Sequence, residues 1–177
     1  MPTDLHWIDG AMPGRLAIMA RPRAGDWLAD EIAGWRAADV GIVVSLLEPH
    51  ESAELGLAAE GELCRRAGMD FISFPIADRG VPDSLRRSTG LARQLAHDLA
   101  AGKAIAVHCR AGIGRSALMA ACALVCRGLT PDTAFTAIAA ARGLPVPDTE
   151  AQVEWVRVFS ETLDERLGSV LDRAAER

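Results

Sequence analysis

Tyrosine is absent from the 177-residue chain, and aromatic residues make up only 5% of it. No apolar run approaches the ~20 residues that a membrane-spanning helix needs. The opening residues, Met1 to His6, do not have the pattern of a secretory signal peptide. The sequence also has no internal repeat, linker or low-complexity segment. We therefore expect one compact domain over residues 1–177, without a membrane span.

The sequence also lacks the cysteine spacing of a disulfide scaffold and an excess of positive charge. The four cysteines, Cys64, Cys109, Cys122 and Cys126, do not follow the paired spacing of a secreted disulfide scaffold or a zinc site. The net charge of −5 argues against nucleic acid as a partner. These features predict a reduced, cytoplasmic protein, and nothing in the sequence indicates its oligomeric state.

Half of the residues are hydrophobic, and apolar runs alternate with helical patterns. This alternation is typical of an α/β fold. The expected strands are residues 16–19, 41–47, 69–76 and 104–108. The expected helices are residues 26–37, 52–67, 83–101, 114–127, 131–142 and 149–172. Thr130 and Pro131 form a favourable helix start, and Gly143 stands where that helix should end.

The most informative segment is His-Cys-Arg-Ala-Gly-Ile-Gly-Arg-Ser at residues 108–116. It lies between an expected strand and an expected helix. A glycine-containing turn followed by a helix start exposes unpaired backbone N–H groups, which together can surround a tetrahedral oxyanion. Such a nest favours the thiolate form of Cys109, a nucleophile. Arg115 adds a planar guanidinium that can hold two phosphate oxygens.

This segment resembles the phosphate-binding loop of the cysteine-dependent protein tyrosine phosphatases, in particular their dual-specificity branch. The shared pattern, His-Cys-x-x-Gly-x-Gly-Arg-Ser, fixes six of nine positions. The resemblance implies a three-layer α/β/α fold with a short, mostly parallel central sheet. It also implies catalysis by Cys109 and Arg115 without metal or cofactor. The phosphate-binding residues carried over from the family are Arg110, Ala111, Gly112, Ile113, Gly114 and Arg115.

A general acid should protonate the leaving oxygen when a phosphate ester is cleaved. The segment Pro75-Ile-Ala-Asp78 resembles the acid-bearing loop of the cyclin-dependent-kinase-associated phosphatases, which identifies Asp78 as the acid. Asp83 is the alternative. It stands just before an expected helix, where a capping role would account for it.

Three further residues have supporting roles in the family. Ser116 would hydrogen-bond the cysteine sulfur, and His108 would brace the loop. Gln152 would position the hydrolytic water, but Thr149 to Gln152 also forms a capping box that explains the glutamine equally well.

The substrate is less well determined than the chemistry. Tyrosine-specific relatives have a longer domain with an aromatic-walled recognition loop, so we expect a dual-specificity cleft here. The loop contains no lysine of the kind found in inositol-lipid phosphatases, which favours a phosphoprotein over a phosphoinositide or another small phosphomonoester.

Two other classes are considered. An inactive phosphate-binding module would typically have lost Cys109, Arg115 or Asp78, and all three are present. A rhodanese-type sulfur carrier has a different loop pattern. The prediction is therefore a phosphomonoester hydrolase.

Overall fold

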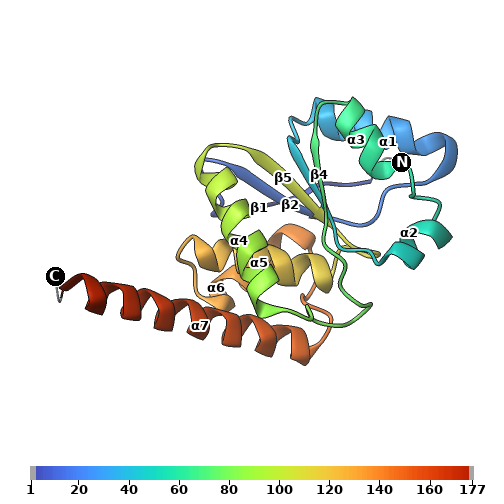
Figure 1. The fold of residues 1–177 in the computed structure, drawn as a ribbon. Coiled ribbons are helices and arrows are strands. Elements are labelled where there is room, and N and C mark those ends of the chain that lie inside the picture. Colours follow the sequence, from blue (N-terminus) through green and yellow to red (C-terminus); the bar gives the residue numbers. More distant parts are fainter. Residues whose placement is uncertain (1–2, 176–177) are drawn as a thin grey trace.

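The computed structural model describes residues 3–175, with the side chains of residues 3–163. Its centre is a five-stranded sheet in the order β1-β2-β5-β3-β4 (Figure 1). The strands are β1 (His6–Ile8), β2 (Arg15–Met19), β3 (Ile42–Ser45), β4 (Asp70–Ser73) and β5 (Ala104–His108). β1 runs antiparallel to β2, and the other neighbouring strands are parallel. The expected mostly parallel sheet is thus confirmed.

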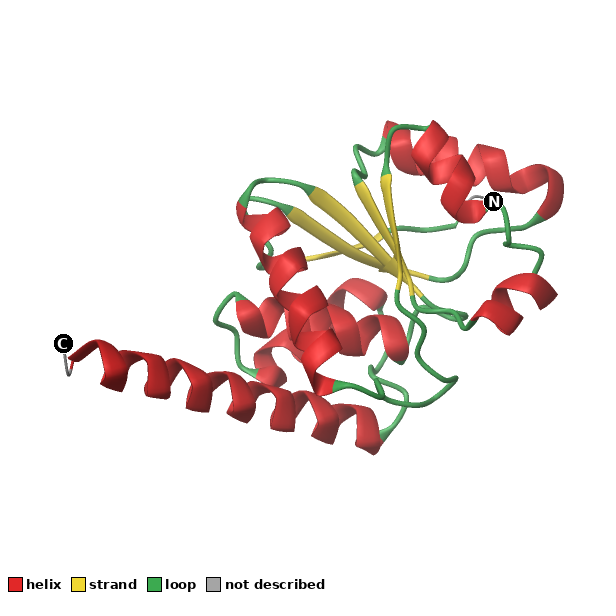
Figure 2. Cartoon of the chain, viewed as in Figure 1, coloured by secondary structure: helices red, strands yellow, loops and turns green. Residues whose placement is uncertain are grey.

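Helices cover both faces of this sheet, as Figure 2 shows. They are α1 (Leu28–Ala37), α2 (Pro49–Glu54), α3 (Glu60–Arg66), α4 (Leu85–Ala100), α5 (Arg115–Cys126), α6 (Pro131–Arg142) and α7 (Glu150–Ala175), with a short 3-10 helix at Gly25–Trp27. One hydrophobic core joins the sheet to α4, α5, α6 and α7, and a second joins it to α1 and α3. The three-layer arrangement is therefore confirmed.

The central strand β5 links the two cores. All five of its residues are buried, and it lies between β2 and β3. Ile105 and Val107 face the α5 side, whereas Ala106 faces the α1 side. Each large apolar side chain buried here stabilises the fold by about 1.5–3 kcal/mol. Because β5 ends at His108, residues 109–114 lie at the carboxyl end of the parallel strands, where α/β sheets bind ligands.

The helix expected over residues 52–67 is wrong as a single element. The chain instead forms α2 and α3, separated by a turn that contains Gly56 at φ +70°. This left-handed conformation suits glycine, and it lets Leu57 turn into the second core, where its exposure is 2%. Strand β1 was also missed, because three residues at a sheet edge carry no readable alternation.

Among residues 3–175, no helix combines the length and the apolar character needed to cross a bilayer.

Candidate active site

Residues 109–114 form the loop between β5 and α5. Gly112 has φ +68°, and a Cβ atom there would lie 2.5 Å from the carbonyl of Met19. A side chain at residue 112 would thus push the loop away from β2. At Gly114, a Cβ atom would lie 2.9 Å from Oε1 of Gln152. Glycine is required at both positions, because neighbouring atoms leave no room for a Cβ atom.

Three backbone carbonyls of the loop accept hydrogen bonds from residues outside it, and these partners lie on what we call its outer side. Arg142 donates from Nε to the carbonyl of Gly112 at 3.0 Å and from Nη2 to that of Ala111 at 3.3 Å. The amide of Arg21 donates to the carbonyl of Arg110 at 3.3 Å. In a planar trans peptide the N–H points opposite to the preceding C=O. The N–H groups of residues 111–113 are therefore directed away from these outer partners, as an anion nest requires.

Cys109 lies at the start of the loop and is 3% exposed. Its Sγ is 3.5 Å from Oγ of Ser116, within the range of a sulfur hydrogen bond. It lines a cavity of about 230 Å³. The other residues around this cavity are Asp78, Arg79, Arg110, Ala111, Ile113, Gly114, Arg115, Asp148 and Gln152.

Arg115 is buried beside Cys109 and is fixed by Glu51. Its Nη1 donates to Glu51 Oε2 at 2.6 Å, and its Nη2 donates to Oε1 at 3.0 Å. Nη1 also donates to the carbonyl of Ile76 at 2.9 Å. This bidentate pairing sets the plane of the guanidinium before any substrate arrives.

The Arg115–Glu51 pair keeps both groups charged. Burial alone would raise the pKa of Glu51, but hydrogen bonds from Arg115 and from the Glu48 amide outweigh it, so the pKa lies below its ordinary value. Burial alone would lower the pKa of Arg115, but the hydrogen bond to Glu51 raises it. A permanent cation is therefore held at the cavity wall.

Sequence analysis missed Glu51. Its local signal is the capping box that begins α2, in which the Glu48 amide donates to Glu51 Oε2 at 3.0 Å. That signal predicts a helix start. It does not predict the contact with Arg115, which is 64 residues away in the chain.

The two candidate acids occupy different environments. Asp78 lines the cavity with Cys109, and its Oδ1 accepts from Arg115 Nη2 at 2.9 Å. The Asp83 side chain is 81% exposed, and its nearest charge partner is Arg87 at 4.0 Å. The geometry brings Asp78 to the site and leaves Asp83 outside it. The capping role expected for Asp83 is wrong, because Ser84 accepts from the Arg87 amide and caps α4.

Gln152 is fully buried at the start of α7. Its Oε1 accepts from the amides of Asp148 and Thr149, so the capping interpretation describes real contacts. Its Nε2 donates to the carbonyl of Gly80 at 2.9 Å, which ties α7 to the loop of Asp78. Gln152 also lines the cavity. Its role in placing the hydrolytic water stays a prediction.

Comparisons with known proteins identify the family of the chain. A family model described as "Swiss Army Knife protein, DSP-PTPase phosphatase domain" matches residues 2–163. The chain belongs to this phosphatase domain family.

Individual proteins and solved structures resemble the chain in sequence or in fold. The mouse (Mus musculus) protein tyrosine phosphatase domain-containing protein 1 is 33% identical over 130 residues, 68% of this chain. The match covers only 17% of that much longer relative. A kinase associated phosphatase, crystallised with serine in place of its catalytic-site cysteine, superposes with a TM-score of 0.82 at 20% identity, over 93% of this chain and 97% of the other. PTPMT1 in complex with PI(5)P gives a TM-score of 0.69 at 23% identity, over 86% and 94%.

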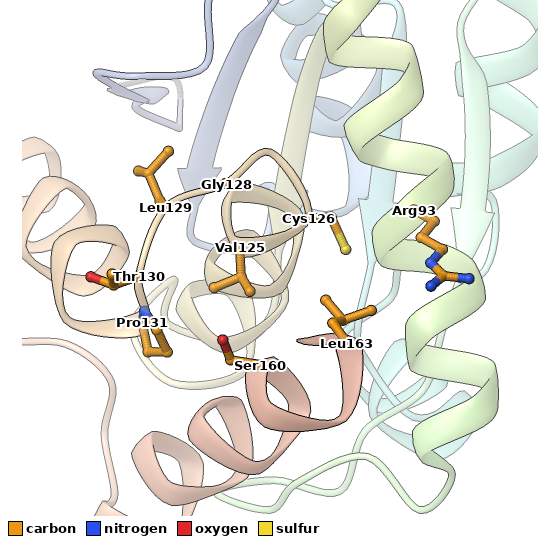
Figure 3. Close-up of a pocket in the computed structure, with 9 residues that line it drawn as sticks. All are labelled: Arg93, Val125, Cys126, Gly128, Leu129, Thr130, Pro131, Ser160 and Leu163. Atoms are coloured by element: carbon orange, nitrogen blue, oxygen red, sulfur yellow. The ribbon is translucent and has the colours of Figure 1, made fainter. Parts of the chain in front are cut away.

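This phosphatase domain has another cavity, of about 410 Å³, shown in Figure 3. It lies between α4, the α5–α6 turn and α7, and its wall includes Cys126 and Leu163. Cys126 is at the far end of the 12-residue helix α5, about 17 Å from the phosphate-binding loop. The cavity is therefore separate from the site of Cys109.

Glu51→Gln should weaken both the fold and the activity of this phosphatase domain. It removes the buried ionic partner of Arg115 and leaves only the half-exposed Asp78, which should lower the free energy of unfolding by on the order of 3 kcal/mol near neutral pH. Because the folded pKa of Glu51 is depressed, this contribution is present above the ordinary value of 4.5 and is lost as the pH falls through the folded value. The difference in unfolding free energy, measured by urea denaturation at pH 7 and pH 3.5, should shrink at the lower pH.

The matched control is Glu54→Gln, at an exposed position on the same helix. It should leave stability and kcat/KM close to wild type. Equal stability of the Glu51 and Glu54 variants at pH 7 would contradict the anchoring role.

Iodoacetamide should modify Cys109 selectively at neutral pH. Burial, helped by the charge of Glu60, raises the pKa of Cys64 to about 12, and burial raises that of Cys126 to about 11. Their thiolate fractions at pH 7 are thus only about 10⁻⁵ and 10⁻⁴. Cys109 instead faces a cavity beside the Arg115 cation. Peptide mass spectrometry should find the label on Cys109 first, and inorganic phosphate should slow the labelling. Faster labelling of Cys126 would contradict this expectation.

Proposed function

We propose that this domain hydrolyses phosphomonoesters through a cysteinyl-phosphate intermediate on Cys109. One observation carries the proposal: a nucleophile, a fixed cation and a carboxylic acid share one cavity of about 230 Å³. Cys109 supplies the sulfur, Arg115 the cation and Asp78 the acid. Each of these groups has a defined role in the two-step reaction.

In the first step the Cys109 thiolate attacks phosphorus. The S–P bond forms as the P–O bond to the leaving group breaks, and Asp78 transfers its proton to the departing oxygen. Arg115 and the loop amides hold the three non-bridging oxygens and stabilise their charge in the transition state.

In the second step a water oxygen attacks phosphorus and the S–P bond breaks. Asp78, now a carboxylate, accepts the proton of that water, and inorganic phosphate is released. The hydroxyl of Ser116, 3.5 Å from the sulfur, can donate to the departing thiolate. Gln152 lines the same cavity and is the group we assign to placing the water.

The arrangement around Arg115 suggests how the substrate enters. Both Nη2 hydrogens are engaged, one by Glu51 and one by Asp78. An incoming phosphate oxygen must therefore displace Asp78 from Nη2, which frees its carboxyl group to meet the leaving oxygen. Glu51 keeps its contacts with Arg115 throughout.

The cavity wall favours a phosphoprotein substrate without selectivity for phosphotyrosine. None of the residues that line it is aromatic, so no ring in its wall can stack on a tyrosine side chain. A phosphoinositide is the second candidate, because Arg79 and Arg110 line the cavity and could bind further phosphates. Four free cysteines favour a reducing compartment, and we propose the cytoplasm.

A substrate panel tests this proposal. The purified protein should be assayed with phosphotyrosine and phosphothreonine peptides, phosphoinositides and sugar phosphates, with and without EDTA. We expect both peptides to be hydrolysed faster than the phosphoinositides, and EDTA to have no effect. Hydrolysis of none of these compounds would identify a binding module instead. Loss of activity in EDTA that a divalent ion restores would contradict the cysteine mechanism.

A further inference from the structure

A buried pair of ionisable side chains lies behind the phosphate-binding loop. Nε2 of His108 is 2.8 Å from Oε1 of Glu60, and the two side chains are 0% and 2% exposed. The contact lacks the geometry of a hydrogen bond, and neither atom has another hydrogen-bond partner among the residues that the structure describes. The apolar core on this face of the sheet contains Met19, Val43 and Cys64. Removing two ionisable groups from water is costly and is recovered only when each has a good partner.

The pair cannot touch the substrate. Successive residues of a strand point to opposite faces of a sheet. Val107 and Cys109 belong to the core on the α5 side, whereas Ala106 belongs to the core on the α1 and α3 side. His108 has the same orientation as Ala106 and meets Glu60, the first residue of α3. Any influence of Glu60 on the chemistry therefore passes through His108 and the end of β5.

A helix start does not explain why Glu60 is buried. An acidic residue in the first helical turn interacts favourably with the helix dipole. Glu62 stands in the same turn of α3 and provides this interaction from solvent, with a side chain 58% exposed. Glu60 is 1% exposed and points at the residue before the nucleophile.

We propose that Glu60 is a positioning residue of the catalytic loop. Its side chain, buried against Nε2 of His108 at 2.8 Å, limits the orientation of the imidazole ring and so holds the strand end from which Cys109 projects. The inference rests on the proposed phosphatase mechanism and adds a residue that acts on it from the opposite face of the sheet.

A cavity on that face makes the idea testable. It has a volume of about 470 Å³, reaches Glu60, and is lined among others by Ser45, Arg65 and Phe71. It shares no lining residue with the cavity of Cys109. Shortening Glu60 to alanine would extend this cavity to His108, so a small carboxylate could enter and take the place of the missing group.

The experiment compares Glu60→Ala with Glu62→Ala. For Glu60→Ala we expect kcat to fall about 10–100-fold, by analogy with the loss of an outer partner of a metal-bound histidine. KM should stay within about two- to threefold of wild type, because Arg115 and the loop amides remain. Sodium formate should restore part of kcat, and formamide, which has the same shape without charge, should not. Glu62→Ala should keep wild-type kcat and show no response to formate.

Several results would overturn the proposal. One is a folded Glu60→Ala variant with kcat within twofold of wild type. Another is a loss of activity that formate does not reverse and that follows a fall in Tm, which would indicate a purely structural role. If the alanine variant does not fold, Glu60→Gln decides the matter. This isosteric variant should lose kcat with KM and Tm near wild type, and full activity would reject the role of the charge.

A second readout separates this proposal from the proposed function. If wild-type protein cleaves no phosphate ester, the function proposal fails, but iodoacetate labelling of Cys109 still reports on the loop. Labelling should be slower in Glu60→Ala than in Glu62→Ala, and formate should accelerate it. Equal labelling rates in the two variants would overturn the role of Glu60 whatever the substrate.

Discussion

Cys109→Ser should abolish turnover and leave anion binding intact. A serine hydroxyl stays protonated near neutral pH and is a far weaker nucleophile than a thiolate. Loss of the nucleophile should therefore lower kcat by about 10⁴-fold or more. Binding should persist, because Arg115 is held by Glu51 and the loop glycines are unchanged. Steady-state kinetics should give the loss, and calorimetric titration with inorganic phosphate or tungstate should give an affinity close to wild type.

Cys126→Ser is the matched control for the nucleophile. Cys126 lines the separate cavity at the far end of α5, and burial raises its pKa to about 11. This variant should retain full activity. Residual hydrolysis above about 1% in Cys109→Ser, persisting through repeated purification, would argue for attack by water or another group and against the covalent intermediate.

The catalytic loop was predictable because its chemistry is contiguous. Cys109, the two glycines and Arg115 fall within a few residues, between a buried strand and a largely buried helix. Strand, loop and helix start are local structures, so their residue types define them directly. The same holds for α6, where Thr130 caps the helix and Gly143 adopts φ +74° at its end, as expected.

The groups that hold the loop were not predictable in this way. Glu51 and Glu60 are separated in sequence from the residues they contact, and the sequence shows each of them only as an acidic residue in the first turn of a helix. Only the parallel pairing of β3 with β5 places α2 and α3 next to the end of β5. The break between those two helices was missed for the same reason, since Leu57 turns inward to reach a core formed by distant strands.

Asp78 stands between these two cases. Its identity came from resemblance to a family loop, and the structure adds a contact that no sequence pattern indicates, the 2.9 Å bond to Arg115 Nη2. In the absence of substrate the acid thus occupies a donor that phosphate needs. Binding of a phosphate dianion should displace the Asp78 side chain from Arg115 toward the leaving oxygen. Replacing this residue should affect the chemical step more than binding.

Asp78→Asn should lower kcat by about 10²–10⁴-fold with an alkyl phosphate and much less with 4-nitrophenyl phosphate. An alkoxide is a poor leaving group that needs the proton, whereas nitrophenolate departs without one. KM should not rise, because asparagine competes less strongly than a carboxylate for Arg115.

Asp83→Asn is the control for Asp78→Asn, because it makes the same chemical change five residues further along the chain. The Asp83 carboxylate is exposed and 4.0 Å from Arg87, and Ser84 caps the helix in its place. Its replacement should therefore leave kcat within about twofold of wild type for both leaving groups, since surface substitutions of this kind cost little. If Asp83→Asn gave the leaving-group-dependent loss and Asp78→Asn did not, Asp83 would be the acid. The loop would then have to close over the cavity differently during catalysis, with the Asp78–Arg115 contact a resting interaction only.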